Sequence, residues 1–69
     1  MQLPPVFQIG DRVRLISLLD MIPIGTVGTV VGQFIGNSLY DVQFDGQPRT
    51  RVVDASSLAP MPPELPQRQ

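Results

Sequence analysis

The 69-residue sequence contains no cysteine, no histidine, no lysine and no tryptophan. Without cysteine the chain can form neither a disulfide nor a thiolate metal site. Without histidine a zinc site would have to consist of carboxylates alone, which is unusual. The residues that most often serve as catalytic bases and nucleophiles are missing as well. We therefore expect no metal, no cofactor and no enzymatic activity.

The chain also has no large excess of charge of one sign, because it contains five arginines and six acidic residues and its formal net charge is −1. Nucleic-acid-binding domains normally carry an excess of basic residues, so a nucleic-acid partner is not expected. The N-terminus lacks the basic start and apolar run of a signal peptide. No apolar run approaches the roughly 20 residues that a membrane helix needs. These features predict a soluble, cytoplasmic protein without a membrane partner.

The eight prolines divide the chain into three parts. Two adjacent prolines in residues 1–6 indicate a flexible, extended arm, and four prolines in residues 60–69 indicate a disordered tail. Residues 7–59 between them are expected to form one small domain. A chain of about 60 residues buries only about 60% of the surface that its unfolded form exposes, so the core of this domain must be compact.

Short runs within the domain alternate apolar and polar residues and are separated by turn signals, which is typical of β-strands. In the run LYDVQF, the side chains of Tyr40, Val42 and Phe44 share one face and are predicted to lie in the core. We expect an all-β fold, a small five-stranded SH3-like barrel, because closing the sheet removes most exposed edges. A three-stranded sheet packed on a loop is the alternative. The expected strands are residues 11–17, 26–34, 39–44, 48 or 49 to 53, and 58–59, with a 3₁₀ turn at 54–57, capped by Asp54, before the last strand.

Glycines and turn residues indicate where the sheet bends. Gly28 and Gly32 lie inside the β-branched run of the second expected strand and predict bulges or sharp bends there. Asp45 and Gly46 are the favoured pair for a tight hairpin in which both residues have positive φ. The loop at residues 18–25, LLDMIPIG, is too apolar to be fully solvated, so part of it is expected to pack on the domain.

Arginine alternates with smaller residues in two of the expected strands. Arg12 and Arg14 are predicted to point outward from the first strand, and Arg49 and Arg51 from the fourth, where Val52 would point inward. If these two strands lie close together, the four arginines form one patch. One interpretation is a solvated face with cross-strand charge pairs. The other is a docking patch for an anion or a protein partner.

The strand pattern resembles that of known small barrel proteins. The segments GDRVRL, GTVGTVVGQF, YDVQFDG and VVDASSLAP resemble KOW-type barrels and a group of uncharacterised bacterial SH3-like proteins, over roughly residues 9–60. The chain is also similar to the ferredoxin-docking barrel subunits of photosynthetic electron transfer. These resemblances imply a binding or accessory subunit rather than a shared reaction. The KOW-type resemblance also implies an alternative, a nucleic-acid binder that uses the four arginines.

A more distant resemblance is to the plasmid-borne type II dihydrofolate reductases, whose barrel opens with Phe-x-x-Gly-Asp-Arg-Val-Arg, as this chain does at residues 7–14. Those enzymes are tetramers with one central pore, which a Val-Gln-Ile-Tyr run lines. The equivalent run here, residues 50–53, reads Thr-Arg-Val-Val, and the pore lysine is absent as well. The resemblance therefore implies a reductase-like homo-oligomer as a further alternative, without a reductase activity to carry over.

The leading hypothesis is a non-catalytic SH3-like protein-binding module, an accessory or regulatory subunit of a larger assembly. Its partner would be another protein or a second copy of the chain. Met21, Ile22 and Ile24 in the apolar first loop would form the contact surface, since an exposed apolar patch on so small a domain usually marks an interface. The four arginines are the other candidate partner-binding residues.

Overall fold

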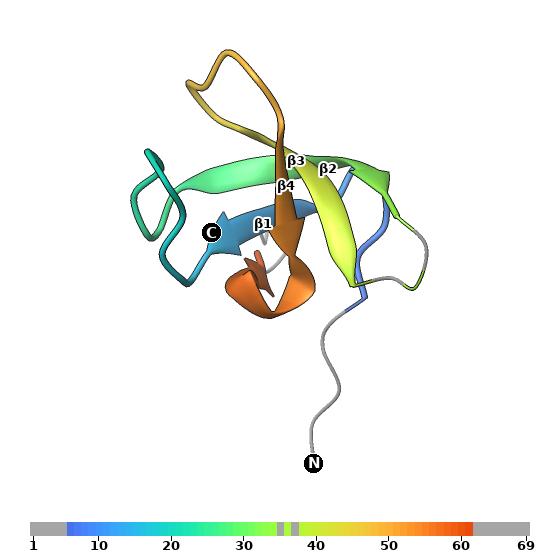
Figure 1. The fold of residues 1–69 in the computed structure, drawn as a ribbon. Coiled ribbons are helices and arrows are strands. Elements are labelled where there is room, and N and C mark those ends of the chain that lie inside the picture. Colours follow the sequence, from blue (N-terminus) through green and yellow to red (C-terminus); the bar gives the residue numbers. More distant parts are fainter. Residues whose placement is uncertain (1–5, 35, 37, 62–69) are drawn as a thin grey trace, which may run out of the picture.

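The structure is a computed structural model that describes residues 6–34, 36 and 38–61. Its strands form one antiparallel sheet in the order β4-β3-β2-β1-β5, and the last strand returns to lie beside the first (Figure 1). The fold is therefore all-β, consistent with the predicted small SH3-like barrel. The elements are β1 (Arg12–Leu15), β2 (Val27–Gln33), β3 (Leu39–Phe44), β4 (Arg51–Asp54), the 3₁₀ helix η1 (Ala55–Ser57) and β5 (Leu58–Pro60).

The ends of the strands differ by a few residues from the predicted ones. The first two strands are shorter than expected, whereas β3 has the predicted bounds. Pro60 belongs to β5, and the N–H of Met61 donates to the Arg12 carbonyl at 3.1 Å, so the sheet reaches into the segment predicted as tail. Residues 1–5 and 62–69, which hold most of the predicted arm and tail, lie outside the described residues.

The core follows the alternation of β3. Tyr40, Val42 and Phe44 are fully buried, as predicted. Phe7 lies edge-on against the Tyr40 ring, with the ring centroids 5.3 Å apart, and its N–H donates to the Tyr40 hydroxyl at 3.0 Å. This bond gives the buried hydroxyl a partner, which a buried tyrosine needs. The other core residues are Val13, Leu15, Ile22, Val30, Val53, Ala55 and Leu58.

The two glycines of β2 act in different ways. The register between β2 and β3 shifts between Val30 and Gly32, which confirms the predicted bulge at the second glycine. Gly28 lies in an unbroken part of the ladder, where β3 packs directly against its Cα. A Cβ atom at position 28 would lie 2.8 Å from the carbonyl oxygen of Gln43. Only glycine therefore allows the two strands this close approach.

The turn after β3 differs from the predicted tight hairpin. Gly46 has a φ of 81°, but Asp45 does not have a positive φ, so the expected turn with two left-handed residues is not present. The Phe44 carbonyl accepts from the Gln47 N–H at 3.1 Å, which closes a β-turn. β4 begins only at Arg51, later than predicted. Pro48 contributes to this delay because proline has no N–H to donate to the ladder.

The side chains of β4 also point the other way from the prediction. Val53, not Val52, faces the core, with 3% of its surface exposed against 54% for Val52. Val53 lies opposite Tyr40 in the register. Directly opposed residues of an antiparallel pair point to the same face, so the buried ring of Tyr40 fixes the orientation of β4.

The short helix η1 turns the chain from β4 into β5. The Asp54 carboxylate accepts from the Ser56 N–H at 3.1 Å, as the predicted cap should. The N–H of Ala55 donates to the carbonyl of Ser38, the residue before β3, at 2.8 Å, which ties the start of η1 to the beginning of β3. No helix among the described residues is long and apolar enough to cross a membrane.

Candidate functional site

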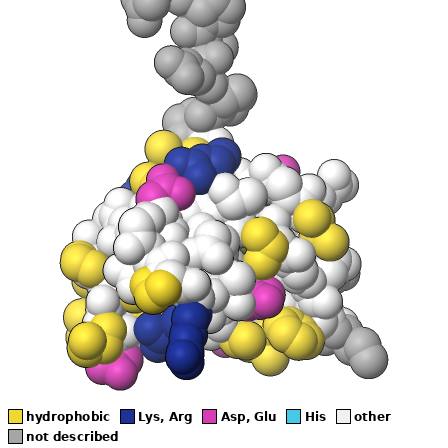
Figure 2. Space-filling model, turned by 90° about the horizontal axis from the view of Figure 1, so that it is seen from above, with side chains coloured by type: hydrophobic (Ala, Val, Ile, Leu, Met, Phe, Trp, Pro, Cys, Tyr) yellow, Lys and Arg dark blue, Asp and Glu magenta, His cyan; other side chains and the backbone are white. Residues whose placement is uncertain are grey.

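The four arginines do not form one patch. β2 and β3 lie between β1, which carries Arg12 and Arg14, and β4, which carries Arg51. In Figure 2 the arginine side chains accordingly lie in two separate groups on the face shown. Arg49 is exposed in the loop before β4. The condition for a single basic patch, that the two strands lie close together, is therefore not met, because the sheet order separates β1 from β4.

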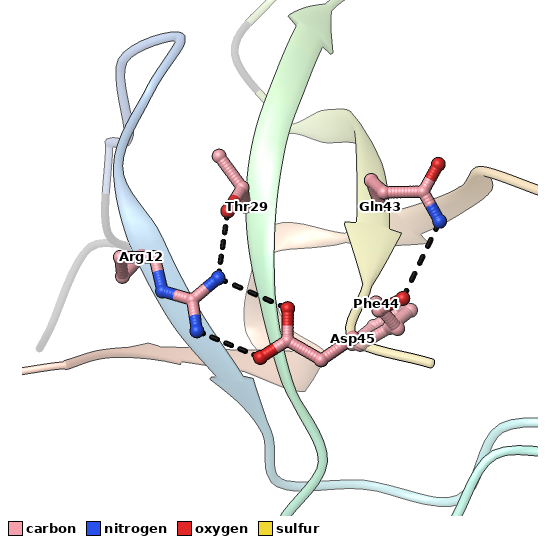
Figure 3. A network of polar contacts seen from close by, with 5 residues as sticks. All are labelled: Arg12, Thr29, Gln43, Phe44 and Asp45. Atoms are coloured by element: carbon pink, nitrogen blue, oxygen red, sulfur yellow. Dashed lines mark hydrogen bonds and ion pairs between the residues drawn. The ribbon is translucent and has the colours of Figure 1, made fainter. Parts of the chain in front are cut away.

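Arg12 is held in a polar network on the outer face of the sheet (Figure 3). Its guanidinium donates to both carboxylate oxygens of Asp45, at 3.1 and 2.7 Å, and to the Thr29 hydroxyl at 2.8 Å. This geometry is the forked pairing that arginine prefers with carboxylates. The hydrogen bonds from Arg12, together with its charge, lower the pKa of Asp45 below its ordinary value of 3.8. Arg12 therefore fits the interpretation as a charge pair on a solvated face.

We predict that the carboxyl group of Asp45 titrates below the ordinary aspartate pKa of 3.8 in NMR pH titrations. Because the folded pKa is lowered, the stability that this pair contributes is present above the ordinary aspartate pKa and is lost as the pH falls through the folded pKa. In Arg12→Gln, the Asp45 pKa should return to near 3.8. High salt should have a similar but partial effect, because both groups are exposed. An unchanged Asp45 pKa in Arg12→Gln would contradict the assignment.

Arg51 connects β4 to the first loop. Its Nη1 donates to the backbone carbonyl of Asp20 at 2.9 Å. The partner is a carbonyl rather than a carboxylate, so the charge of Arg51 is not neutralised by a salt bridge. Among the described residues the same holds for Arg14 and Arg49, since the Arg12–Asp45 pair is the salt bridge found there. Three guanidinium charges therefore remain available to a partner.

The first loop places its apolar side chains in opposite directions. Ile22 is 4% exposed and belongs to the core, with Leu19 packed beside it. This confirms that part of the loop packs on the domain, but it corrects the prediction that Ile22 contributes to a contact surface. Met21 and Ile24 are 81% and 57% exposed, and Leu18 is also exposed. We call Leu18, Met21 and Ile24 the loop patch.

Two successive turns shape the loop patch. The first is closed by the Ile22 N–H, which donates to the Leu19 carbonyl at 3.2 Å, and the second by the Thr26 N–H, which donates to the Pro23 carbonyl at 3.2 Å. Met21 lies in the first turn with a φ of 70°, the one non-glycine residue with a positive φ in the described part of the chain. This conformation costs an L-residue about 1–2 kcal/mol. The loop therefore displays a methionine where glycine would be more stable.

A second apolar patch was not anticipated from the sequence. Phe34, Leu39 and Val52, which we call the sheet patch, are exposed on the outer face of β2, β3 and β4. Phe34 donates its N–H to the Leu39 carbonyl at 3.1 Å, which places the two residues opposite each other. Val52 lies opposite Asp41, the next outward residue of β3 after Leu39. Sequence alternation is enough to place the Leu39 side chain on the outer face of β3. The outward direction of Val52 depends on the register of β4, which the sequence does not give.

The described residues contain no group of three or more His, Asp or Glu side chains able to hold a metal ion. The site features are therefore two apolar patches and a set of charged side chains.

A comparison with protein-family models matches residues 5–57 to the family described as the Xrn1 SH3-like domain. A search of the curated proteins and a search of the solved structures each found no significant match. The family match supports the SH3-like barrel, but it does not support the bacterial, KOW-type or reductase resemblances, which stay hypotheses. Because the match runs through β1, β2, β3, β4 and η1, and so spans most of the 69 residues, the chain belongs to the family of Xrn1 SH3-like domains.

Proposed function

We propose that this protein is a non-catalytic protein-binding module whose contact surface is the loop patch. The observation that supports this proposal is the exposure of Leu18, Met21 and Ile24 on one short loop that is anchored to the core by Ile22. Exposed apolar side chains gathered on one surface of a small domain are typical of interaction sites. The anchoring means that the surface is held in place before a partner arrives, which lowers the entropy cost of binding.

The conformation of Met21 adds a second argument. Strained backbone persists where the surrounding structure enforces it, and such strain is concentrated at functional sites. Methionine is also a common residue of binding surfaces, since its side chain is flexible and polarisable. A methionine with a φ of 70° and 81% exposure contributes little to folding, so a role in binding accounts for it best.

The charges around the loop indicate the chemistry of the partner. Arg51 contacts the loop through the Asp20 carbonyl, and Arg49 lies two residues before it; within residues 6–34, 36 and 38–61 neither has a carboxylate partner. Complementary charges favour the correct partner and speed its association. The favoured partner is therefore a protein segment with an apolar side chain flanked by Asp or Glu.

The reductase alternative is less well supported. The run at residues 50–53 would have to line a pore and meet a substrate, but Val53 is in the core and Arg51 is bound to the first loop. Only one apolar side chain of the run, Val52, is exposed. For the nucleic-acid alternative, Arg12 is paired with Asp45, which removes one of the four arginines on which it relies.

Met21→Gly is the variant that tests the proposed function. Glycine relieves the strain at φ 70° but removes the apolar side chain, so the melting temperature should rise by about 4–8 °C, as about 1 kcal/mol does in so small a domain. A displayed peptide library should yield apolar sequences flanked by Asp or Glu on the wild type. Met21→Gly should bind these peptides about 10-fold more weakly or worse, a loss of about 1.4 kcal/mol or more.

Ile9→Ala is the matched control, because Ile9 is also exposed and apolar but lies in the turn before β1. It should leave peptide binding unchanged. The proposed function would be contradicted if the wild type selected no peptides, or if Met21→Gly bound them as well as the wild type did. Because Met21→Gly is expected to be more stable than the wild type, a loss of binding could not be attributed to misfolding.

A further inference from the structure

The two apolar patches have different charges around them. Arg51 contacts the loop that carries the loop patch, through the Asp20 carbonyl, and Arg49 lies two residues before it in the chain, whereas the acid of that loop is the exposed Asp20. Next to the sheet patch lie Asp41 and Asp54. Arg51, the arginine of β4, lies opposite the buried Val42 and so is not on this face, which corrects the prediction that it points outward. Figure 2 shows hydrophobic side chains both on the left, where the first loop lies in Figure 1, and on the right, toward the connection between β2 and β3.

Asp41 is the central residue of the sheet patch. Cross-strand pairing places it between Gly32 of β2 and Val52 of β4, and Leu39 lies two residues before it on the same face of β3. Its Oδ1 is buried and accepts no hydrogen bond within the described part of the chain. A buried carboxylate oxygen without a donor is costly, since it loses water and gains nothing in return. The residue as a whole is half-buried, so Asp41 still contributes negative charge to the surface of the sheet patch.

The nearest other acid, Asp54, already has partners. Its Oδ1 accepts from the Ser56 N–H at 3.1 Å and from the Ser56 hydroxyl at 3.2 Å. It still adds negative charge to the edge of the sheet patch, since it lies opposite Leu39. The sheet patch therefore combines apolar side chains with two carboxylates. A cationic group with an apolar neighbour is its natural complement.

We propose that the partner of the loop patch is the sheet patch of a second copy of this chain, which rests on the proposed function of the loop. The loop patch offers apolar side chains beside arginines, and the sheet patch offers apolar side chains beside aspartates. In such a contact Arg49 or Arg51 of one copy faces the acidic pair Asp41 and Asp54 of the next, while Met21 packs against Phe34 and Leu39.

The contact joins two different surfaces, so it is heterologous rather than two-fold symmetric. Each copy then keeps one free loop patch and one free sheet patch, and association continues head to tail into a ring or an open chain. Both patches are small, so we expect a dissociation constant of about 10 µM to 1 mM for each contact. Because the contact joins opposite charges at the protein surface, the association should be weaker at high salt.

Two single variants test the contact. Met21→Asp places a carboxylate on the loop patch, where it would face Asp41 of the next copy. Val52→Arg places a cation on the sheet patch, where it would face Arg51. Light scattering behind a sizing column should show a mass that rises with concentration for the wild type, and the mass of one chain for each variant. Each substitution should weaken the contact at least about 10-fold.

Mixing the two variants separates a head-to-tail contact from a symmetric one. Met21→Asp retains a good sheet patch and Val52→Arg retains a good loop patch, so the mixture should form a dimer of twice the single-chain mass and grow no further. A symmetric contact between two loop patches could not be restored by mixing. The expected result is a mixed dimer at concentrations at which each variant alone is monomeric.

The inference is overturned if the wild type stays monomeric at about 1 mM, since even a weak contact would then be visible. It is also overturned if Val52→Arg associates as the wild type does, or if the mixture stays monomeric. A monomeric wild type whose loop patch still binds acidic apolar peptides would leave the proposed function intact and remove only the second copy as partner. If the wild type associates but Met21→Gly binds peptides as well as the wild type does, the proposed function of the loop patch is contradicted, although the chain self-associates.

Discussion

Ile22→Asp should leave the chain unfolded at 25 °C, whereas Ile24→Asp, two residues further along the same loop, should fold like the wild type. Ile22 is 4% exposed among core residues, and Ile24 is 57% exposed. Burying a carboxylate without a partner costs several kcal/mol even after its pKa adjusts. A domain of this length has a free energy of unfolding of only about 3–10 kcal/mol. The cost of burying a carboxylate at position 22 is therefore comparable with the total stability of the domain.

Two-dimensional NMR spectra and thermal unfolding would check this pair of variants. Ile24→Asp should keep the dispersed amide peaks of the wild type and melt within a few degrees of it, because surface substitutions change stability by only about 0.5 kcal/mol. Ile22→Val is the control for position 22 and should lose only about 1 kcal/mol. A dispersed spectrum for Ile22→Asp would show that the loop can leave the core without unfolding the domain, and the anchoring of the loop patch would then be wrong.

The contrast between Ile22 and Ile24 also shows where the sequence loses its predictive power. In a strand, period-two alternation assigns each side chain to a face. In the first loop two β-turns follow one another, and Met21 within the first of them has a φ of 70°. No fixed period relates neighbouring side chains there. The apolar content of the loop predicted that something packs, but not which residue.

The strands also differ in how well the sequence predicts which side chains face the core. Every core residue of β3 could be predicted, because apolar and polar residues alternate there without ambiguity. β4 contains Val52 and Val53 side by side, so either valine could face the core. Its register is decided by the pairing of Val53 with the buried Tyr40 of β3. This is tertiary information, and the outward direction of Val52, on which the sheet patch depends, follows from it.

The charged residues were the least predictable. Arg12 meets Asp45 across 33 residues of sequence, and Arg51 meets Asp20 across 31. Alternation correctly placed Arg12 and Arg14 on the outer face of β1. Which charges are neutralised depends on the order of strands in the sheet, which places two strands between the groups. Of the four arginines, Arg12 is in a salt bridge, whereas Arg14, Arg49 and Arg51 are in none within the described part of the chain.

Gly28→Ala is expected to have the second large effect, although it adds only one methyl group. The added Cβ would lie 2.8 Å from the Gln43 carbonyl oxygen, 2.8 Å from Cγ1 of Val42 and 3.0 Å from the Cα of Phe44. Two of these three atoms belong to the backbone of β3, so the strands would have to separate. Overpacking of this kind costs about 1–3 kcal/mol and occasionally more, and we expect a melting temperature lower by at least about 10 °C.

Gly32→Ala is the matched control, since it makes the same change four residues further along β2. A Cβ at position 32 would meet the Cβ of Asp41 at 3.4 Å, an ordinary contact, and Gly32 does not have a positive φ. Alanine there should be neutral or stabilise by up to about 1 kcal/mol, because it restricts the unfolded chain. Equal melting temperatures for the two variants would mean that β2 and β3 are further apart at Gly28 than the structure shows. Since Val42, Phe44 and the outward Asp41 all belong to β3, the same separation would move the sheet patch, and Gly28→Ala should therefore weaken self-association as well as stability.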